Sequence, residues 1–232
     1  MRIRGGIGLA TACLFGSVSC GRAAVTMEYR SGYAFSRTER NAIESVAYRA
    51  AHDVRQLLPS LPAELRITVQ VGSRVIPETG ETAGTGLPGA VYWTVDPNHN
   101  GGVIAVVNAQ LRATLFHEWY HLVREARVTQ NSLADEAVNE GLATAFERDY
   151  GGAPTPWGTY PSDVEAWTRE FLALPADAPS RQWMYQHPDG RRWIGFRVGT
   201  YLADRAVRAS GLSLAQLATM PTDKVIALAK LQ

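Results

Sequence analysis

The order of apolar and polar positions predicts one helix, then short strands, then mostly helices. Ser36–Leu58 has an apolar residue at every fourth position, a serine that can cap its first turn, and prolines just beyond its end, as in an amphipathic helix. Leu65–Val71 alternates apolar and polar residues, which is typical of a half-buried strand. Ala90–Val95 and Gly102–Val107 are apolar, β-branched runs separated by a turn sequence, so they predict a hairpin.

The second half of the chain is predicted to be helical. Its apolar periodicity marks four longer helices and a short one: Ala109–Arg127, Ser132–Tyr150, Ser162–Leu174, Gly195–Ala209 and Leu214–Met220. Ser73–Gly89 is rich in Gly, Pro and Thr and predicts a mobile loop. A helix, a small mixed or antiparallel sheet and then helices is the order of an α+β fold, and we expect residues 24–232 to form one such domain.

Composition limits the class of protein but does not indicate a particular reaction. The chain has 232 residues, of which 46% are hydrophobic, enough for a sizeable core. Lys and Arg number 23 against 22 Asp and Glu, for a formal net charge of +1, and no dense basic segment is present. Such a balance argues against a surface that binds nucleic acid.

The N-terminus has the features of an export signal. Met1–Arg4 contains two arginines, and Gly5–Val18 is an uncharged stretch that is too short to cross a bilayer of about 30 Å. Residues 1–23 therefore predict a signal peptide. The mature domain is expected to be periplasmic, extracellular or attached to the cell envelope.

Two processing routes are compatible with this signal. Ser17–Cys20 resembles a bacterial lipobox, in which case a lipid on Cys20 would attach the protein to the membrane. Ordinary cleavage after Ser19 or Ala23 would release the protein instead. Cys13 and Cys20 are the only cysteines, so the mature chain keeps at most one and forms no intramolecular disulfide.

The sequence HEWYH at positions 117–121 carries the clearest chemical signal. Four residues turn an α-helix through about 400°, so His117 and His121 project from one face, about 40° apart. Both imidazoles can then bind one zinc ion at about 2.0–2.1 Å, and Glu118 beside them can take a proton from a zinc-bound water. Apolar residues cover most of the rest of this helix, which indicates that it is buried and that its polar side chains need partners.

A zinc site of this type needs a third protein ligand. The metzincin pattern would place glycine at 124 and histidine at 127, but this chain has Arg124 and Arg127, so that class is excluded. The next predicted helix offers Glu140, which flanks its apolar face, and Glu136, one step nearer to solvent. Gly141 would let the two helices approach closely beside Glu140. Glu140 is therefore the expected third ligand, and Glu136 the alternative.

HEWYH followed by the Glu140 of NEGLA resembles the gluzincin branch of zinc peptidases. The pattern is similar to the bacterial family of predicted zinc-dependent proteases catalogued as DUF2268, over roughly Leu65–Leu217. Gly195–Gly199 (GFRVG) resembles the Gly-aromatic-x-x-Gly helix of that family, with phenylalanine where tyrosine is usual. The resemblance implies a zincin-like fold that hydrolyses peptides or proteins. It also implies one zinc ion held by His117, His121 and Glu140, with Glu118 as the general base.

Two further parts of a peptidase site stay open in the sequence. The oxyanion on the scissile carbonyl needs a hydrogen-bond donor, and an extended substrate commonly pairs with an edge strand. The candidate edge strands are Ala90–Val95 and Gly102–Val107. The candidate donors all follow the two metal-binding helices: Tyr185, His187, Arg197 and Tyr201.

Two other functions fit the same residues. A zinc hydrolase of a non-peptide amide or ester would have an identical metal site. An exported binding or scaffolding lipoprotein would keep the site for structure alone. Glu118 argues against this last reading, because a structural zinc site has no use for a base beside an open coordination position. We therefore expect a secreted or lipid-anchored zinc metallopeptidase, with its oligomeric state left open.

Overall fold

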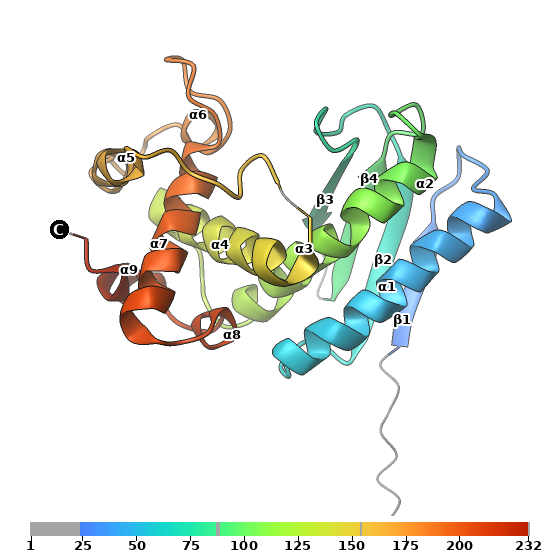
Figure 1. Cartoon of the computed structure of the whole chain (residues 1–232), viewed down its shortest axis with the longest axis horizontal. Coiled ribbons are helices and arrows are strands. Elements are labelled where there is room, and N and C mark those ends of the chain that lie inside the picture. Colours follow the sequence, from blue (N-terminus) through green and yellow to red (C-terminus); the bar gives the residue numbers. More distant parts are fainter. Residues whose placement is uncertain (1–23, 87–88, 154, 232) are drawn as a thin grey trace, which may run out of the picture.

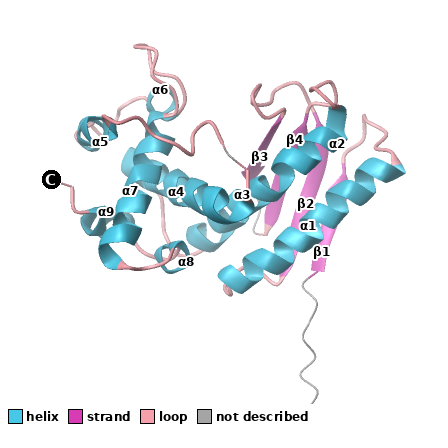
Figure 2. Ribbon diagram, in the orientation of Figure 1, coloured by secondary structure: helices cyan, strands magenta, loops and turns pink. Residues whose placement is uncertain are grey.

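The computed structural model describes residues 24–86, 89–153 and 155–231 (Figure 1). The predicted signal peptide, residues 1–23 with Cys20, lies outside them. A four-stranded sheet stands on one side of the molecule and most of the C-terminal helices on the other (Figure 2). Between them runs α3 (Arg112–Glu125), the helix that carries HEWYH.

The sheet is mixed and has the strand order β1–β2–β4–β3. β2 (Glu64–Val71) pairs in parallel with β1 (Ala24–Tyr29) and β4 (Ala90–Val95), while β3 (Glu81–Thr85) runs antiparallel to β4 at the edge. Alternate apolar residues of β2 and β4 enter the core: Leu65, Ile67, Val69, Val91, Trp93 and Val95. The α+β prediction with a small mixed sheet is confirmed.

The prediction missed the two edge strands. β1 directly follows the predicted signal peptide. β3 falls within Ser73–Gly89, so the prediction of a loop is wrong for Glu81–Thr85. The sequence of β3, ETAGT, is poor in apolar side chains. The strand forms because its backbone pairs with β4, where Ala83 lies opposite Trp93.

The predicted hairpin is wrong in its second half. Gly102–Val107 begins a helix: α2 (Gly102–Val106) continues through a π-helical turn (Val107–Leu111) into α3. Three of its valines, spaced three and four positions apart, are buried: Val103, Val106 and Val107. That spacing places them on one helical face, so packing overrides the strand preference of β-branched residues.

α1 (Arg37–Leu57) confirms the predicted N-terminal helix. Ser36 and Glu39 form a reciprocal cap, in which the Ser36 hydroxyl accepts from the Glu39 N–H at 3.2 Å and the Glu39 carboxylate accepts from the Ser36 N–H at 2.7 Å. α1 and α3 lie on the same face of the sheet (Figure 1) and pack against each other. This packing fixes α3 relative to the strands.

α4 (Leu133–Phe146) and α7 (Ile194–Ser210) form the centre of the C-terminal half. Their backbones touch, because a Cβ added to Gly141 would lie only 1.9 Å from the carbonyl carbon of Gly199. The close approach that Gly141 permits is therefore to α7. The sequence prediction of a close approach to α3 at this glycine is wrong.

The remaining helices pack against α7 or, in the case of α8, against α4. They are α5 (Val164–Leu172), α6 (Ser180–Met184), α8 (Leu214–Leu217) and α9 (Thr222–Ala229). α5, α7 and α8 were predicted, with ends that differ by a few residues. No helix in the described ranges is long and apolar enough to span a membrane.

Arg124 connects α3 to the C-terminal segment. Its buried guanidinium donates to backbone carbonyls between Leu217 and Met220 at 2.8–3.4 Å and to the Thr222 hydroxyl at 3.2 Å. Carbonyls at a helix end lack intrahelical partners and attract a cation. The arginine that excludes the metzincin pattern thus has a structural role close to HEWYH.

Candidate metal centre and its cleft

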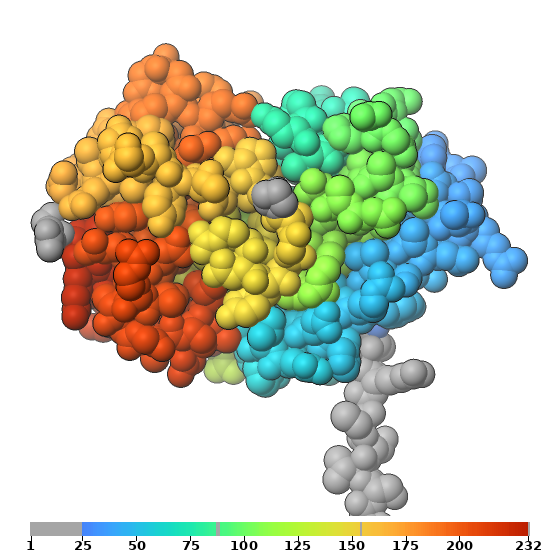
Figure 3. Space-filling view, in the orientation of Figure 1, coloured from blue at the N-terminus to red at the C-terminus, as the bar shows by residue number. Residues whose placement is uncertain are grey.

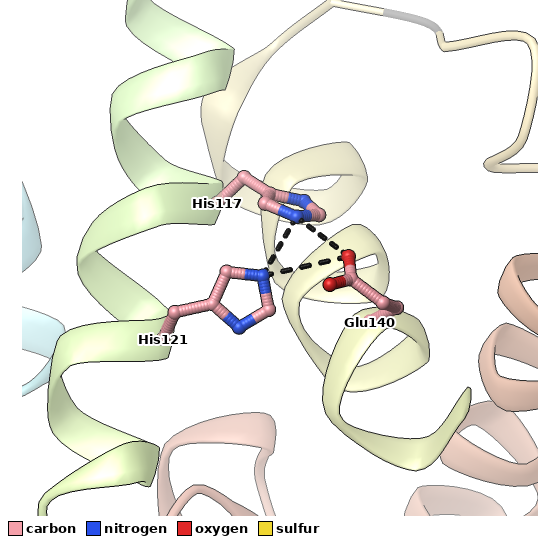
Figure 4. Close-up of side chains that lie close together, drawn as sticks. All are labelled: His117, His121 and Glu140. Atoms are coloured by element: carbon pink, nitrogen blue, oxygen red, sulfur yellow. Dashed lines mark hydrogen bonds and ion pairs between the residues drawn. The ribbon is translucent and has the colours of Figure 1, made fainter. Parts of the chain in front are cut away.

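Helix α3 presents two imidazoles to one point. His117 and His121 lie one turn apart, and their rings are in an edge-to-face arrangement with centroids 4.6 Å apart (Figure 4). Their Nε2 atoms are 2.9 Å apart. The two side chains are only 12% and 5% exposed. Enclosure of α3 between the sheet and α4 therefore holds both rings in a fixed geometry.

Glu140 brings a carboxylate to these imidazoles from α4. Its Oε2 lies 3.2 Å from His117 Nε2 and 3.5 Å from His121 Nε2 (Figure 4). Ligand atoms of the three side chains all lie within 4.8 Å of one another, so the group could hold a metal ion. Ser132 caps α4, and its hydroxyl accepts a hydrogen bond from the Asp135 N–H at 3.1 Å. This cap fixes the start of the helix at Leu133, seven residues before Glu140.

Glu136, the alternative third ligand, lies elsewhere. It accepts a hydrogen bond from the Ser180 hydroxyl at 2.7 Å, at the start of α6. One helical turn separates it from Glu140, which moves its carboxylate about 6 Å along α4. The structure therefore brings Glu140 to the imidazoles and leaves Glu136 outside the group.

Sequence reasoning missed Glu147, which contacts the other nitrogen of His117. The Glu147 Oε2 lies 3.0 Å from His117 Nδ1, and this carboxylate is 4% exposed. It sits in the π-helical turn Glu147–Gly151 that extends α4. Seven residues are nearly two helical turns, so the spacing of Glu140 and Glu147 was a usable signal. A carboxylate that accepts a hydrogen bond from Nδ1–H keeps the proton on that nitrogen, so the lone pair of Nε2 is free to bind a metal.

The carboxylates and imidazoles shift one another's proton affinities. Burial would lower the pKa of His117, but hydrogen bonds and charges from Glu140 and Glu147 raise it well above its usual value. Burial would raise the pKa of Glu140, but the charges of His121 and His117 hold it far below the usual range. Glu118, also buried, has a raised pKa, chiefly because burial disfavours its charge. The pocket thus concentrates negative charge that a bound cation would neutralise.

The donor set fits zinc. Two imidazole nitrogens and one carboxylate oxygen are the ligands of a common class of catalytic zinc site, in which a fourth position stays open for water or substrate. The His117–Glu147 contact supplies the outer hydrogen bond that such imidazoles usually have. His121 Nδ1 is buried and has no hydrogen-bond partner among the described residues.

These side chains form the floor of a cleft of about 400 Å³. Residues of β3 line one side of it, and an aromatic group from the C-terminal half lines another. The lining includes Thr82, Ala83, Gly84, Thr85, His117, Glu118, His121, Glu140, Trp157, Tyr185, Trp193 and Phe196. A cleft of this size takes a short stretch of an extended chain and opens directly onto the candidate metal ligands.

Residues 43–227 match the family described as Predicted Zn-dependent protease (DUF2268). The chain belongs to the DUF2268 family. The matched segment contains α3, α4 and α7 and every candidate metal ligand. The sequence matched none of the curated proteins with which it was compared.

The Gly-aromatic-x-x-Gly segment of this DUF2268 protein has a packing role and a cleft role. A Cβ on Gly195 would lie 2.0 Å from the Met184 sulfur, and one on Gly199 would lie 1.8 Å from the Ala137 carbonyl oxygen. Both glycines therefore let α7 sit tightly against its neighbours. Phe196, between them, lines the cleft.

The four candidate oxyanion donors separate in the structure. Tyr185 lines the cleft. His187 pairs with Asp189 at 2.8 Å, and Tyr201 packs edge-on against Tyr160. The fourth, Arg197 on α7, donates a hydrogen bond to the Pro156 carbonyl. Only Tyr185 of the four is therefore placed near the candidate metal ligands.

Glu81 is a second buried carboxyl that the sequence did not single out. It lies on β3, lines the cleft, and accepts hydrogen bonds from the Trp93 indole and the Thr114 hydroxyl. Burial raises its pKa to about 7, although these two donors act in the opposite direction. The folded protein therefore holds this proton more tightly than the unfolded chain does.

We expect Glu81→Gln to change how stability depends on pH. Because the folded-state pKa is raised, the wild-type free energy of unfolding falls as pH rises from about 4.5 to about 7. Glutamine does not titrate. Between pH 4 and pH 8, the free energy of unfolding of the variant should therefore rise by on the order of 3 kcal/mol relative to that of wild type.

Denaturant unfolding at both pH values measures this difference. Glu64→Gln, at an exposed carboxyl of β2, is the matched control and should run parallel to wild type. A pH-independent difference between Glu81→Gln and wild type would show that Glu81 ionises normally in the folded protein.

Proposed function

We propose that this DUF2268 protein is a zinc-dependent metallopeptidase with a zincin-like fold. The observation that carries the proposal is the group His117, His121 and Glu140, with Glu118 beside it, at the floor of an open cleft. Family membership supports the zinc-dependent protease class. Bound zinc would supply a Lewis acid that acidifies water and polarises the scissile carbonyl.

The chain's own residues divide the remaining work. His117, His121 and Glu140 would hold the ion, and Glu147 is a positioning residue that keeps the His117 imidazole in one tautomer. Glu118 would accept a proton from the attacking water and deliver it to the departing amine. Because the pKa of Glu118 is raised, its protonated and ionised forms are closer in free energy at neutral pH, which suits a group that both accepts and releases a proton.

We propose that β3 is the strand on which the substrate backbone lies. β3 is an edge strand of the sheet. Among the described residues its outer side carries a single bridge, from Glu81 to Ile76, so the edge from Thr82 to Thr85 is free to accept an extended chain, and these residues line the cleft. The two strands considered from sequence do not serve this purpose. β4 lies between β2 and β3, and Gly102–Val107 is helical.

Metal removal and restoration test the proposed function. A mixed peptide library is incubated with the purified protein, with the chelator-treated protein and with the same sample after zinc is restored, and products are identified by mass spectrometry. We expect cleavage to be lost on chelation and to return with zinc, because the attacking water then regains its activation.

The other outcomes separate the alternatives. Zinc-dependent turnover of small amide or ester substrates without any peptide cleavage would indicate a non-peptide hydrolase. Zinc binding without any turnover would indicate an exported binding protein in which zinc is structural. Peptide cleavage that survives chelation would show that this metal group is not the peptidase centre.

A further inference from the structure

Four aromatic side chains form a continuous wall on the cleft. Trp157 and Trp193 have ring centroids 5.2 Å apart, and Phe196 lies 5.6 Å from Trp193. Tyr185 joins them, 5.8 Å from both Trp193 and Phe196. We call these four residues the aromatic wall. Three separate chain segments contribute to it, so only the tertiary fold assembles it.

The wall stands across the candidate metal centre from β3. In Figure 1, α6 and the start of α7 lie on one side of α3 and α4, and β3 lies on the other. Both sides line the same cleft with His117, Glu118 and Glu140. A peptide backbone placed on β3 would therefore be able to direct a side chain toward the aromatic wall.

The wall is held in place at a conformational cost. Trp193 has φ 59° and ψ 35°, a left-handed conformation that is rare for a bulky residue. Its N–H donates to the Tyr185 carbonyl at 2.9 Å, which joins the two wall residues. Strained backbone of this kind is retained mainly at functional sites. Tyr185 also keeps 45% of its surface exposed, which is unusual for a large aromatic side chain in such a group.

Charges around the wall indicate what it would bind. The Arg192 guanidinium lies over the Trp193 ring, 5.3 Å from its centroid. Arg197 donates a hydrogen bond to the carbonyl of Pro156, the residue before Trp157. Because Arg192 already covers one face of Trp193, a positively charged occupant would meet a like charge there, and because Arg192 is paired with Glu78, it is not left to attract an acidic occupant. An uncharged apolar group remains, which stacks well on aromatic rings.

Arg192 also links this region to the other side of the cleft. It forms an ion pair with Glu78 at 2.9 Å, and Glu78 lies just before β3. In the space-filling view, the orange segment around residues 180–195 meets the teal segment that precedes β3 at this place (Figure 3). The ion pair keeps Arg192 over the Trp193 ring.

We propose that the aromatic wall binds a large uncharged side chain, aromatic or branched aliphatic, next to the scissile bond of the peptide substrate. The inference rests on the proposed peptidase function and names the substrate class that this function would select. It predicts that the protein prefers such a residue at one position beside the cut.

Cleavage of a mixed peptide library first shows which residues flank the cut. Two quenched peptides that differ only at the preferred position, Phe against Ala, then measure selectivity as a ratio of kcat/KM. Tyr185→Ala and Trp157→Leu should each lower this ratio about tenfold, because contact area with the Phe ring is lost. Tyr185→Phe keeps the ring and should keep the ratio. Tyr48→Ala, at a 50% exposed tyrosine of α1, should also leave it unchanged.

A binding measurement gives a readout that does not depend on turnover. In the Glu118→Gln background, the Phe peptide should shift the tryptophan fluorescence at lower concentration than the Ala peptide. Tyr185→Ala should reduce the difference between the concentrations at which the two peptides shift the fluorescence. Cleavage without preference for large apolar residues, or a ratio unchanged in both wall variants, would overturn the inference and leave the peptidase function standing. Failure of the parent protein to cut any peptide would instead overturn the proposed function, and the inference with it.

Discussion

Glu118→Gln is expected to lower kcat/KM for a cleaved peptide by about 10²- to 10⁴-fold while zinc stays bound. The amide has nearly the shape of the carboxylate but cannot accept a proton from the attacking water or pass one to the leaving amine. Glu118 lies next to the ligand group and is not itself a member of it. The loss should therefore appear in kcat, with zinc content and thermal stability close to wild type.

Steady-state kinetics on one quenched peptide and elemental analysis of the same samples measure both quantities. Glu125→Gln is the matched control, because Glu125 also lines the cleft from α3 but lies at its exposed end. It should keep most of the activity. Equal activity of Glu118→Gln and wild type would show that another group moves the proton.

Glu140→Ala is expected to weaken zinc binding by more than about 100-fold. That is the upper range for losing a residue that only orients a ligand, and Glu140 is proposed to contact the ion itself. Glu136→Ala, one turn away on the same helix, should change zinc affinity less than about threefold, because Glu136 contacts Ser180 and not the imidazoles. Competition with a chromophoric chelator gives both dissociation constants.

Circular dichroism of the metal-free variants controls for folding in this comparison. Both substitutions lie on α4, so a general disturbance of that helix would affect the two variants alike. Zinc binding by Glu140→Ala at wild-type affinity would contradict the ligand assignment. A strong loss in Glu136→Ala together with retention in Glu140→Ala would move the assignment to the alternative residue.

The proximity of His117, His121 and Glu140 was predictable because it depends largely on local helix geometry. The spacing of His117 and His121 places them on one face of any α-helix. Glu140 required a choice between two glutamates, and the stripe of apolar residues on its helix made that choice possible. Glu140 lies next to α3 as expected, but the reason given was wrong, because Gly141 packs against Gly199 of α7.

The rest of the cleft depends on contacts between distant segments. Glu147 meets His117 because α4 continues through a π-helical turn, and its seven-residue spacing from Glu140 was a local signal of this contact that the prediction did not use. Glu81 is buried because β3 pairs with β4, although its own sequence reads as a loop. The aromatic wall likewise combines residues from three segments. Sequence periodicity reports on one element at a time and does not show such combinations.

The incorrect hairpin has a similar cause. Gly102–Val107 is rich in β-branched residues, which favour strands when considered alone. Its valines are also spaced for one face of a helix, and burial of that face beside α1 decides the outcome. The error placed one expected substrate strand in a segment that is helical, and β3 at the edge of the sheet is proposed in its place.

The zinc content of the purified protein, measured after dialysis against metal-free buffer, tests the central claim most directly. We predict close to one zinc ion per chain in the wild type and a loss of most of it when His117 and His121 are both replaced by alanine. A wild-type protein that retains no zinc, or a double variant that retains as much as wild type, would contradict the assignment of this cleft as a zinc centre.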